Sequence, residues 1–405
     1  MGDALMKPLR TIPHLLLLGI LAVVSYACSE PLEFADWLLP VPEGTSIYEY
    51  AAVPFEARDQ HIELVEDLVI GQRDDDPDYI LYRANSLQVD ADGNIFVLDS
   101  GNSRVQMFDA AGEYVRTFGR RGQGPAEIGR PGGLALAGER VVVRDTANRR
   151  YGMWSLDGAH LTDLPYPSRD SPLTMQGLAD GTVLGRVPVL DPDRSPLGGP
   201  PGYRLVWFDA DMAELATIHE FPPAELPLIV RRSNGGTSIA RVGVPAPDPS
   251  HAATHAGEVY ASLCEEYQIH AYDAAGTMRW ALRVAWQRGP ISEEEIVTAM
   301  ERARVNMPDA SRSEVDFPER RPALRRITVD GHGHLFAFPY EEADDADPDT
   351  IPVDVYSPTG AHLFSGWMPN LVWSDARGDF VYDLESDDDS GEERLIRYRI
   401  VEPFE

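Results

Sequence analysis

Hydrophobic residues recur along residues 87–119 in short runs that are separated by turn residues. The segment reads LQVDADGNIFVLDSGNSRVQMFDAAGEYVRTFG, with Asp-Gly, Gly-Asn and Ala-Gly pairs between the runs. Such pairs are typical of hairpin turns, because glycine and asparagine adopt positive φ angles at low cost. The run 95–98 is apolar at every position, so we expect neighbouring sheets to cover both of its faces. The pattern predicts four consecutive antiparallel strands.

The same pattern returns in the next part of the chain with a constant offset of 46 residues. The matching pairs are Asp99 and Asp145, Asn102 and Asn148, Arg104 and Arg150, Phe108 and Trp154, and Gly112 and Gly158. A repeat of four strands with a period of about 40–50 residues is typical of the blades of a β-propeller.

Looser copies of this unit predict further blades. We expect blades over 84–118, 133–164, 173–218, 237–285 and 323–367, and a last blade that begins near residue 370 with only three strands. A ring closes by joining its first and last blades, so the missing strand is predicted at 60–70, paired with 393–401. The predicted fold is all-β: a six-bladed β-propeller of four-stranded antiparallel blades over residues 60–405, closed by an N-terminal strand. Seven blades is the alternative count.

Insertions interrupt the repeat. Residues 290–305, PISEEEIVTAMERARV, predict one helix, with Ser292 and Glu295 forming a capping box at its start. Residues 186–202 and 243–257 are rich in proline, glycine and small residues, so we expect them to be surface loops.

The N-terminus has the features of an export signal. Lys7 and Arg10 precede an apolar run at 15–24, which is too short to cross a bilayer, since crossing requires about 20 residues. Ala27 before Cys28 resembles the bacterial lipobox, although Ser25 stands where that motif usually has leucine. We predict a signal peptide over 1–27, lipidation at Cys28 and a tether over 28–59. Ordinary secretion and a retained anchor are the alternatives.

The net charge and the small numbers of lysines and cysteines narrow the range of possible functions further. The chain has 35 Lys and Arg against 66 Asp and Glu, a net charge of −31, which excludes a general nucleic-acid binder. Lys7 is the only lysine, so a mature protein without residues 1–27 has no lysine for Schiff-base chemistry. If Cys28 carries lipid, Cys264 has no disulfide partner, and we expect it to be a small buried strand residue.

The repeat resembles NHL-repeat propellers, and most closely the six-bladed β-propeller lipoproteins of bacterial envelopes. The likeness is carried by DADGNIFVLDSGNSRVQMFDAAGEYVRTFGRRGQGP at 90–125 and by the weaker copy at 133–164. It implies a propeller that is exported to the bacterial cell envelope. It implies no particular reaction, because most such lipoproteins have no assigned activity.

Arginines in the hairpins and interblade loops are candidates for binding an anionic ligand at one end of the ring. These residues are Arg104, Arg120, Arg121, Arg149 and Arg150. In the alternative interpretation, the repeated Asp and Arg residues fix each hairpin and bridge blades, while Asn takes the left-handed turn position. Recurrence in successive blades favours this alternative, because a fold needs such contacts in every blade and a ligand needs them once.

A metal site is weakly indicated. Carboxylates that could point into the channel are Asp90, Asp99, Asp145 and Asp330, and Ca²⁺ would fit them better than Zn²⁺. Apart from this, we predict no cofactor. His251 and His255 are four residues apart, but they lie in a segment with no helical pattern.

These observations predict a lipid-anchored, exported propeller that acts as a binding module for an envelope protein or a small anionic ligand, without catalysis. It would touch the membrane only through its lipid. The first alternative is a metal-dependent hydrolase or lyase at the central channel, since gluconolactonase-type and amidating-lyase enzymes use similar rings. A scaffold within an envelope complex is the second. Convergence of three or more carboxylates or imidazoles in the channel would favour the enzyme.

Overall fold

The computed structural model describes residues 34, 38–71, 76–166, 171–189, 202–223, 226–233, 236–340, 349–371, 373–386 and 392–401. Residues 34–405 form one compact unit. The predicted signal peptide 1–27, the predicted lipidation site Cys28 and most of the predicted loop 186–202 lie outside the described residues.

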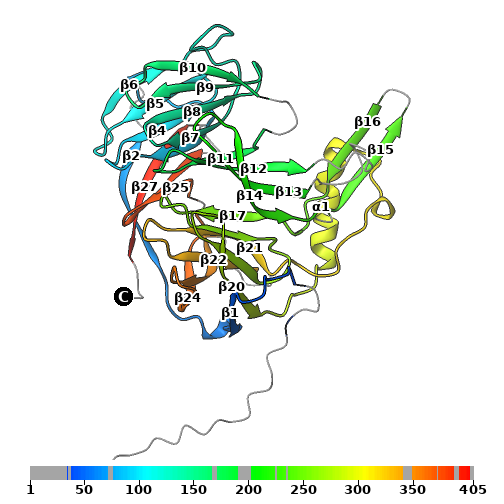
Figure 1. Cartoon of the computed structure of the whole chain (residues 1–405). Helices are drawn as coiled ribbons and strands as arrows, with labels where there is room; N and C mark the ends of the chain where they lie inside the picture. Colours follow the sequence, from blue (N-terminus) through cyan, green and yellow to red (C-terminus); the bar gives the residue numbers. More distant parts are fainter. Residues whose placement is uncertain are drawn as a thin grey trace, which may run out of the picture. The chain divides into compact units, whose positions relative to one another are not determined.

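The compact unit is a six-bladed β-propeller (Figure 1). Blade 1 contains β3 (Ala84–Val89), β4 (Ile95–Asp99), β5 (Arg104–Phe108) and β6 (Tyr114–Phe118). Blade 2 contains β7 (Pro131–Ala137), β8 (Arg140–Asp145), β9 (Arg150–Ser155) and β10 (His160–Pro165). Blade 3 contains β11 (Thr174–Gly177), β12 (Val183–Val189), β13 (Gly202–Phe208) and β14 (Glu214–Phe221).

The second half of the ring repeats this order. Blade 4 contains β17 (Ser250–Ala253), β18 (Val259–Ser262), β19 (Gln268–Tyr272) and β20 (Met278–Ala285). Blade 5 contains β21 (Leu324–Val329), β22 (Leu335–Pro339), β23 (Thr350–Tyr356) and β24 (His362–Pro369). Blade 6 contains β25 (Asp375–Arg377), β26 (Phe380–Ser386), β27 (Glu393–Val401) and, from the other end of the chain, β2 (Glu63–Ile70).

Pairing of β2 with β27 closes the ring. The two strands are antiparallel, with Leu64 opposite Ile400 and Ile70 opposite Leu395, and they lie side by side in Figure 1. The predicted closure by an N-terminal strand is confirmed. Closure of this kind protects the last blade, because an unpaired edge strand exposes a row of backbone donors and acceptors.

Apolar contacts between neighbouring sheets hold the blades together. Every residue of β4 is buried. Ile95 and Val97 pack in the cluster shared with blade 6, whereas Phe96 and Leu98 pack against Leu134 and other residues of blade 2. The run has no alternating polar positions because each side chain packs against another sheet. Burial of each of these side chains contributes roughly 1.5–3 kcal/mol to the stability of the fold.

The turn between the third and fourth strands repeats in every one of the first five blades. Gly112, Gly158, Gly276 and Gly360 adopt positive φ there, between 79° and 88°. In blade 3 the equivalent residue is Met212, with φ 59°. Glycine is favoured at this position because other residues are strained in the left-handed region.

The segment before β2 covers the outer edges of two blades. β1 (Ser46–Ala51) pairs in parallel with β20 and becomes a fifth strand of blade 4. Further along, the N–H of Ile62 donates to the carbonyl of Trp367 at the edge of blade 5 (2.8 Å), and the buried guanidinium of Arg58 pairs with Asp354 at 2.8 Å. Part of the range 28–59, predicted to be a tether, is therefore packed on the ring.

An accessory unit lies beside blades 3 and 4 (Figure 1). It contains the hairpin β15 (Leu228–Ser233) and β16 (Gly236–Arg241), the helix α1 (Glu293–Asn306) and two apolar side chains that join them, Ile229 and Met300. Ser292 and Glu295 form the predicted capping box. Among the described residues, no helix has both the length and the apolar character needed to cross a bilayer.

Two short 3-10 helices, η1 (Phe55–Ala57) and η2 (Arg312–Glu314), complete the described elements.

The boundaries predicted for blade 4 were wrong. The blade begins at residue 250 and not at 237, because residues 236–241 belong to the accessory hairpin. The predicted surface loop 243–257 therefore contains β17, the innermost strand of the blade.

Candidate functional site

Side chains join the inner strands of the blades around the central channel. The amide oxygen of Gln88 in β3 accepts from the N–H of Leu136 (2.5 Å) and of Gly177 (3.3 Å). The amide nitrogen of Gln176 donates to the carbonyl of Ala253 at 2.8 Å. These bonds connect blades 1, 2, 3 and 4, so polar contacts fix the inner strands relative to one another.

The remaining inner strands are joined in the same way. Ser250 Oγ accepts from the N–H of Ile327 (3.0 Å), which connects blades 4 and 5. Asp375 Oδ2 accepts from the N–H of Val89 (2.7 Å), which connects blades 6 and 1. Trp373 Nε1 donates to the carbonyl of Val329 (2.9 Å), which connects blades 6 and 5.

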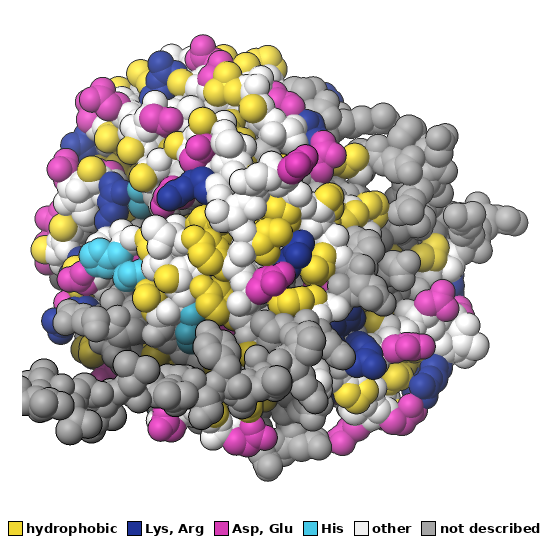
Figure 2. Space-filling model, turned by 60° about the horizontal axis from the view of Figure 1, so that its bottom comes forward, with side chains coloured by type: hydrophobic (Ala, Val, Ile, Leu, Met, Phe, Trp, Pro, Cys, Tyr) yellow, Lys and Arg dark blue, Asp and Glu magenta, His cyan; other side chains and the backbone are white. Residues whose placement is uncertain are grey.

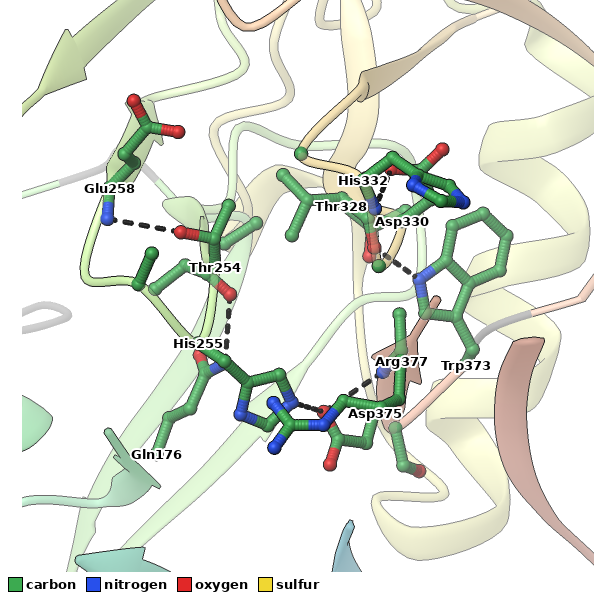
Figure 3. A pocket seen from close by; sticks show the side chains of 18 of the residues that line it. Gln176, Thr254, His255, Glu258, Thr328, Asp330, His332, Trp373, Asp375 and Arg377 are labelled. Carbon is green, nitrogen blue, oxygen red and sulfur yellow. Dashed lines mark hydrogen bonds and ion pairs between the residues drawn. The ribbon is translucent and has the colours of Figure 1, made fainter. Parts of the chain in front are cut away.

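A cavity of about 370 Å³ opens at the end of the channel where the inner strands turn into the second strands. Blades 3 to 6 supply its walls. In Figure 3, His255, Asp375 and Arg377 lie at one edge, and Asp330 and His332 lie at the opposite edge. The lining residues are Gln176, 251–256, Glu258, 328–333 and 373–377.

His255 and Asp375 form a pair at the cavity edge. His255 Nε2 lies 3.1 Å from Asp375 Oδ1, and the Asp375 side chain is only 4% exposed. Asp375 also accepts from the N–H of Val89 and of Ala376. Three donors therefore surround this buried carboxylate, which explains how its charge is accommodated away from water.

The two other acidic side chains of the lining are also engaged. Asp330 accepts from the N–H of His332 (2.9 Å) and of His334 (2.8 Å), and it pairs with His334 Nδ1 at 2.8 Å. Glu258 pairs with Arg279 on β20, the fourth strand of its own blade. Three carboxylates and three imidazoles thus line the cavity, a convergence of the kind that would favour the enzyme, but all three carboxylates already have donors from the protein.

The basic groups of the cavity form fewer hydrogen bonds with the protein than the acidic groups do. Arg377 Nε donates to the carbonyl of Asp90 in the β3–β4 turn (3.1 Å), and its two terminal nitrogens have no partner among the described residues. Burial, helped by the positive charge of Arg186, lowers the pKa of His251 to about 4. The half-buried His251 imidazole is therefore neutral at neutral pH, and it too has no hydrogen-bond partner in the described part of the chain.

Arg104 and Arg150, two of the candidate ligand-binding arginines, contact other residues of the protein. Asp99 is fully buried, accepts from the N–H of Tyr82 (3.0 Å) and pairs with Arg104 at 2.7 Å. Asp145 and Arg150 occupy the equivalent places in blade 2, where Arg150 donates to the carbonyls of Gly124 and Glu127. Each set fastens its hairpin to the loop that precedes the blade.

The left-handed turn residue of these hairpins differs from the one expected. Ser103 (φ 57°) and Arg149 (φ 53°) adopt positive φ, one position after each asparagine. The asparagines serve the turn with their side chains instead, because Asn102 and Asn148 donate to Asp99 and Asp145.

The other predicted arginines lie at the opposite end of the ring from the cavity. The exposed Arg120 pairs with Glu127 at 2.8 Å. Arg121 donates to the carbonyl of Gly101 at 2.7 Å. Arg149 is exposed on the β8–β9 turn.

The four carboxylates considered as metal ligands occupy two kinds of position. Asp90 and Asp330 hold the turns after the inner strands of blades 1 and 5, whereas Asp99 and Asp145 end the second strands of blades 1 and 2. Within the described ranges, no group of three His, Cys, Asp or Glu side chains has an arrangement that could hold a metal ion.

Of the residues that line the cavity, sequence reasoning named Asp330 as a candidate metal ligand and missed the others. The segment of His251 and His255 shows no helical pattern, yet a four-residue strand and the turn after it hold both residues at the channel mouth. Asp375 and Arg377 lie in 371–384, a segment that echoes the first hairpin of the repeat. Position relative to that hairpin is the signal that could have identified them.

Comparisons with known proteins agree with this architecture. A family model described as a 6-bladed beta-propeller (DUF5128) matches residues 80–163. No curated protein matches the sequence. A member of the DUF4221 family from Bacteroides vulgatus has a TM-score of 0.50 and 13% identity, over 84% of this chain and 98% of that chain. The chain is therefore a six-bladed β-propeller.

Two further solved structures are similar at lower scores. A candidate exported protein from Bacteroides fragilis has a TM-score of 0.46 and 12% identity, over 88% of this chain and 99% of that chain. Virginiamycin B lyase from Staphylococcus aureus has a TM-score of 0.39 and 10% identity, over 84% of this chain and 100% of that chain. At such identities the likeness concerns the fold alone.

Proposed function

We propose that this protein is an exported, lipid-anchored binding module that holds a small ligand at the mouth of its central channel. The ligand carries a carboxylate or another anionic group, which Arg377 binds. One observation carries the proposal: the acidic side chains of the cavity are engaged by protein donors, whereas the terminal nitrogens of Arg377 have no partner among the described residues.

A guanidinium in this position suits an anion. Its planar pair of terminal nitrogens matches the two oxygens of a carboxylate, and such charge-assisted bonds strengthen in a concave, partly desolvated site. The net charge of −31 makes local complementarity more important, since the chain as a whole repels anions. Figure 2 shows acidic and basic side chains interspersed over one face of the protein.

The rest of the cavity supports recognition of a polar ligand. A neutral imidazole at His251 offers one donor and one acceptor, and the hydroxyl groups of Thr254 and Thr328 lie on neighbouring walls. The expected ligand therefore combines an anionic group with hydroxyl, carbonyl or amide groups. A concave site with a few convergent polar groups is the usual form of a small-molecule site.

Export and lipidation rest on the N-terminal sequence. Residues 1–27 have the pattern of a signal peptide, and Cys28 follows the small residue Ala27. A lipid on Cys28 would place the ring at a membrane surface, where it would meet ligands or proteins of the envelope.

The experiment is a calorimetric titration of the purified protein with a panel of small hydroxy- and keto-carboxylates, and with inorganic phosphate. We expect at least one carboxylate to bind, and Arg377→Gln to weaken that binding by about tenfold or more. Arg120→Gln is the matched control, because Arg120 lies at the opposite end of the ring and pairs with Glu127.

Two results would contradict the proposal. The first is a panel in which no anionic compound binds the native protein. The second is an Arg377→Gln protein that is folded by its melting temperature and binds the same carboxylate as tightly as the native protein.

A further inference from the structure

A second, larger cavity of about 740 Å³ opens at the other end of the ring, where β3 and β7 begin. It lies between blades 1 and 2, on the side of the hairpins that join second and third strands. The residues that line it are Tyr82, Arg83, Ala84, Asn85, Ser100, Gly101, Ser103, Arg121, Gly129, Arg130 and Pro131.

Three arginines dominate this lining. The guanidinium of Arg83 lies over the ring of Tyr82, 5.3 Å from its centroid. Arg121 donates to the carbonyl of Gly101 (2.7 Å), and Arg130 Nε donates to Thr146 Oγ1 (2.9 Å). None of the three makes an ion pair with another described residue, in a chain whose acids outnumber its basic residues by 66 to 35.

No acidic residue is among the described residues that line the cavity. The carboxylate of Glu393, which lies beside it, is already engaged: its two oxygens accept from the backbone N–H groups of Arg83 and Ala84, both at 2.6 Å. These bonds hold Arg83 in a left-handed conformation, φ 52°. The backbone from which one of the three guanidinium groups extends is therefore fixed before any ligand arrives.

Neutral groups add to the donors. Ser100 Oγ donates to the amide oxygen of Asn85 at 2.6 Å, which leaves the amide nitrogen of Asn85 as a further donor beside the arginines. Three positive charges and an amide donor around one concavity suit a ligand with several negative charges, because a single carboxylate can engage only one guanidinium in the bidentate geometry.

We propose that this arginine-lined cavity is a second binding site, for a ligand that carries two or more adjacent phosphate groups. It is independent of the site at the channel mouth, which lies at the other end of the ring and contains Arg377. Tetrahedral phosphates present several oxygens in different directions, so adjacent phosphates can engage Arg83, Arg121 and Arg130 together.

The test is a titration of the full chain with inorganic tripolyphosphate. Orthophosphate, which has only one phosphate group, is the comparison. We expect tripolyphosphate to bind about tenfold or more tightly than orthophosphate, and the affinity to fall as salt rises. Arg121→Gln combined with Arg130→Gln should weaken tripolyphosphate binding about tenfold or more. A separate Arg83→Gln protein should show a loss in the same direction, and it guards against misfolding of the double variant.

Arg120→Gln is the matched control, because Arg120 is adjacent in sequence but lies outside the lining and pairs with Glu127. It should retain the native affinity, as should Arg377→Gln, so failure here is distinguishable from failure at the channel mouth. Sedimentation with phosphatidylcholine vesicles, with and without a bisphosphorylated lipid, distinguishes a membrane-borne ligand from a free one. The proposal is overturned if both phosphates bind equally weakly, or if the arginine variants bind tripolyphosphate as the native protein does.

Discussion

The imidazole of His255 and the carboxylate of Asp375 lie 3.1 Å apart at the channel mouth, although 120 residues separate them in the sequence. His255 follows the inner strand of blade 4, and Asp375 begins the inner strand of blade 6. The same carboxylate also accepts from Val89 in blade 1. One buried side chain therefore connects three blades and orients an imidazole at the edge of the cavity.

This relationship predicts that Asp375→Asn destabilises the protein. An asparagine would turn an N–H donor toward the donors that the carboxylate now accepts from, leaving buried groups unsatisfied. We expect a loss of about 2–3 kcal/mol in the free energy of unfolding, measured by urea denaturation. Asp379→Asn is the control, because Asp379 is 68% exposed and, among the described residues, its side chain pairs only with His332. It should change stability by less than about 0.5 kcal/mol, and equal effects would contradict the assigned role.

A pair of buried histidines between blades 3 and 4 predicts loss of stability in acid. Burial lowers the pKa of His219 to about 4 and that of His270 to about 3. Their ring centroids are 5.4 Å apart, and three of the four ring nitrogens have no partner in the described structure. Below the usual histidine pKa of about 6.5, the unfolded chain binds protons that the native pair excludes, so stability falls as the pH falls from there toward 4.

The size of that effect is about 3 kcal/mol per histidine between neutral pH and pH 4, from the shift of each pKa. Replacing both residues, His219→Gln with His270→Gln, should flatten the dependence of unfolding free energy on pH over this range. The exposed His61 supplies the control, His61→Gln, which should keep the native slope. A double variant with the native slope would show that other groups cause the acid sensitivity.

Cys264 is predicted to be unreactive in the native protein. It is buried as expected, but it lies in the turn between β18 and β19 (φ 65°) and not in a strand. Burial raises the pKa of its thiol to about 12. Because the thiolate is the reactive form, iodoacetamide should fail to label it at mildly alkaline pH and should label it fully in guanidinium chloride. The measurement is made on a Cys28→Ser chain, so that only one thiol is present. Rapid labelling of the folded protein would contradict the burial of this residue.

Cys28→Ser tests the anchor. If Cys28 is lipidated, the variant should lose acyl labelling and move from the membrane fraction to the soluble fraction, because attachment then depends on the lipid chains alone. Cys264→Ala is the matched cysteine control and should stay with the membrane. Unchanged fractionation of Cys28→Ser would show that this cysteine is not the attachment point.

The repeating part of the fold could be predicted because the same hairpin and turn contacts recur from blade to blade. Asp99 and Asp145 recur at one offset since each closes a hairpin with Asn and Arg, and Gly112 and Gly158 recur since each turn needs positive φ. The missing last strand followed from the geometry of a ring. The hairpins and turns are local features, so one sequence is enough to reveal them.

The accessory hairpin and the cavity could not be predicted in this way. An insertion at 228–241 displaced the start of blade 4, and β17 is too short and too rich in small residues to show an alternating pattern. The cavity draws on blades 3 to 6, and its residues approach one another only when the ring closes. His255 belongs to no local motif that would single it out, and Arg377 could be found only from its position in the segment 371–384, which echoes the first hairpin of the repeat.

The most direct test of the central claim is a crystal structure of the protein with the tightest-binding carboxylate of the titration panel. The account predicts that the anionic group lies at the channel mouth, with its oxygens about 2.7–2.9 Å from the terminal nitrogens of Arg377. It would be contradicted by a structure in which that group is bound elsewhere, with the lining of this cavity making no contact to the ligand.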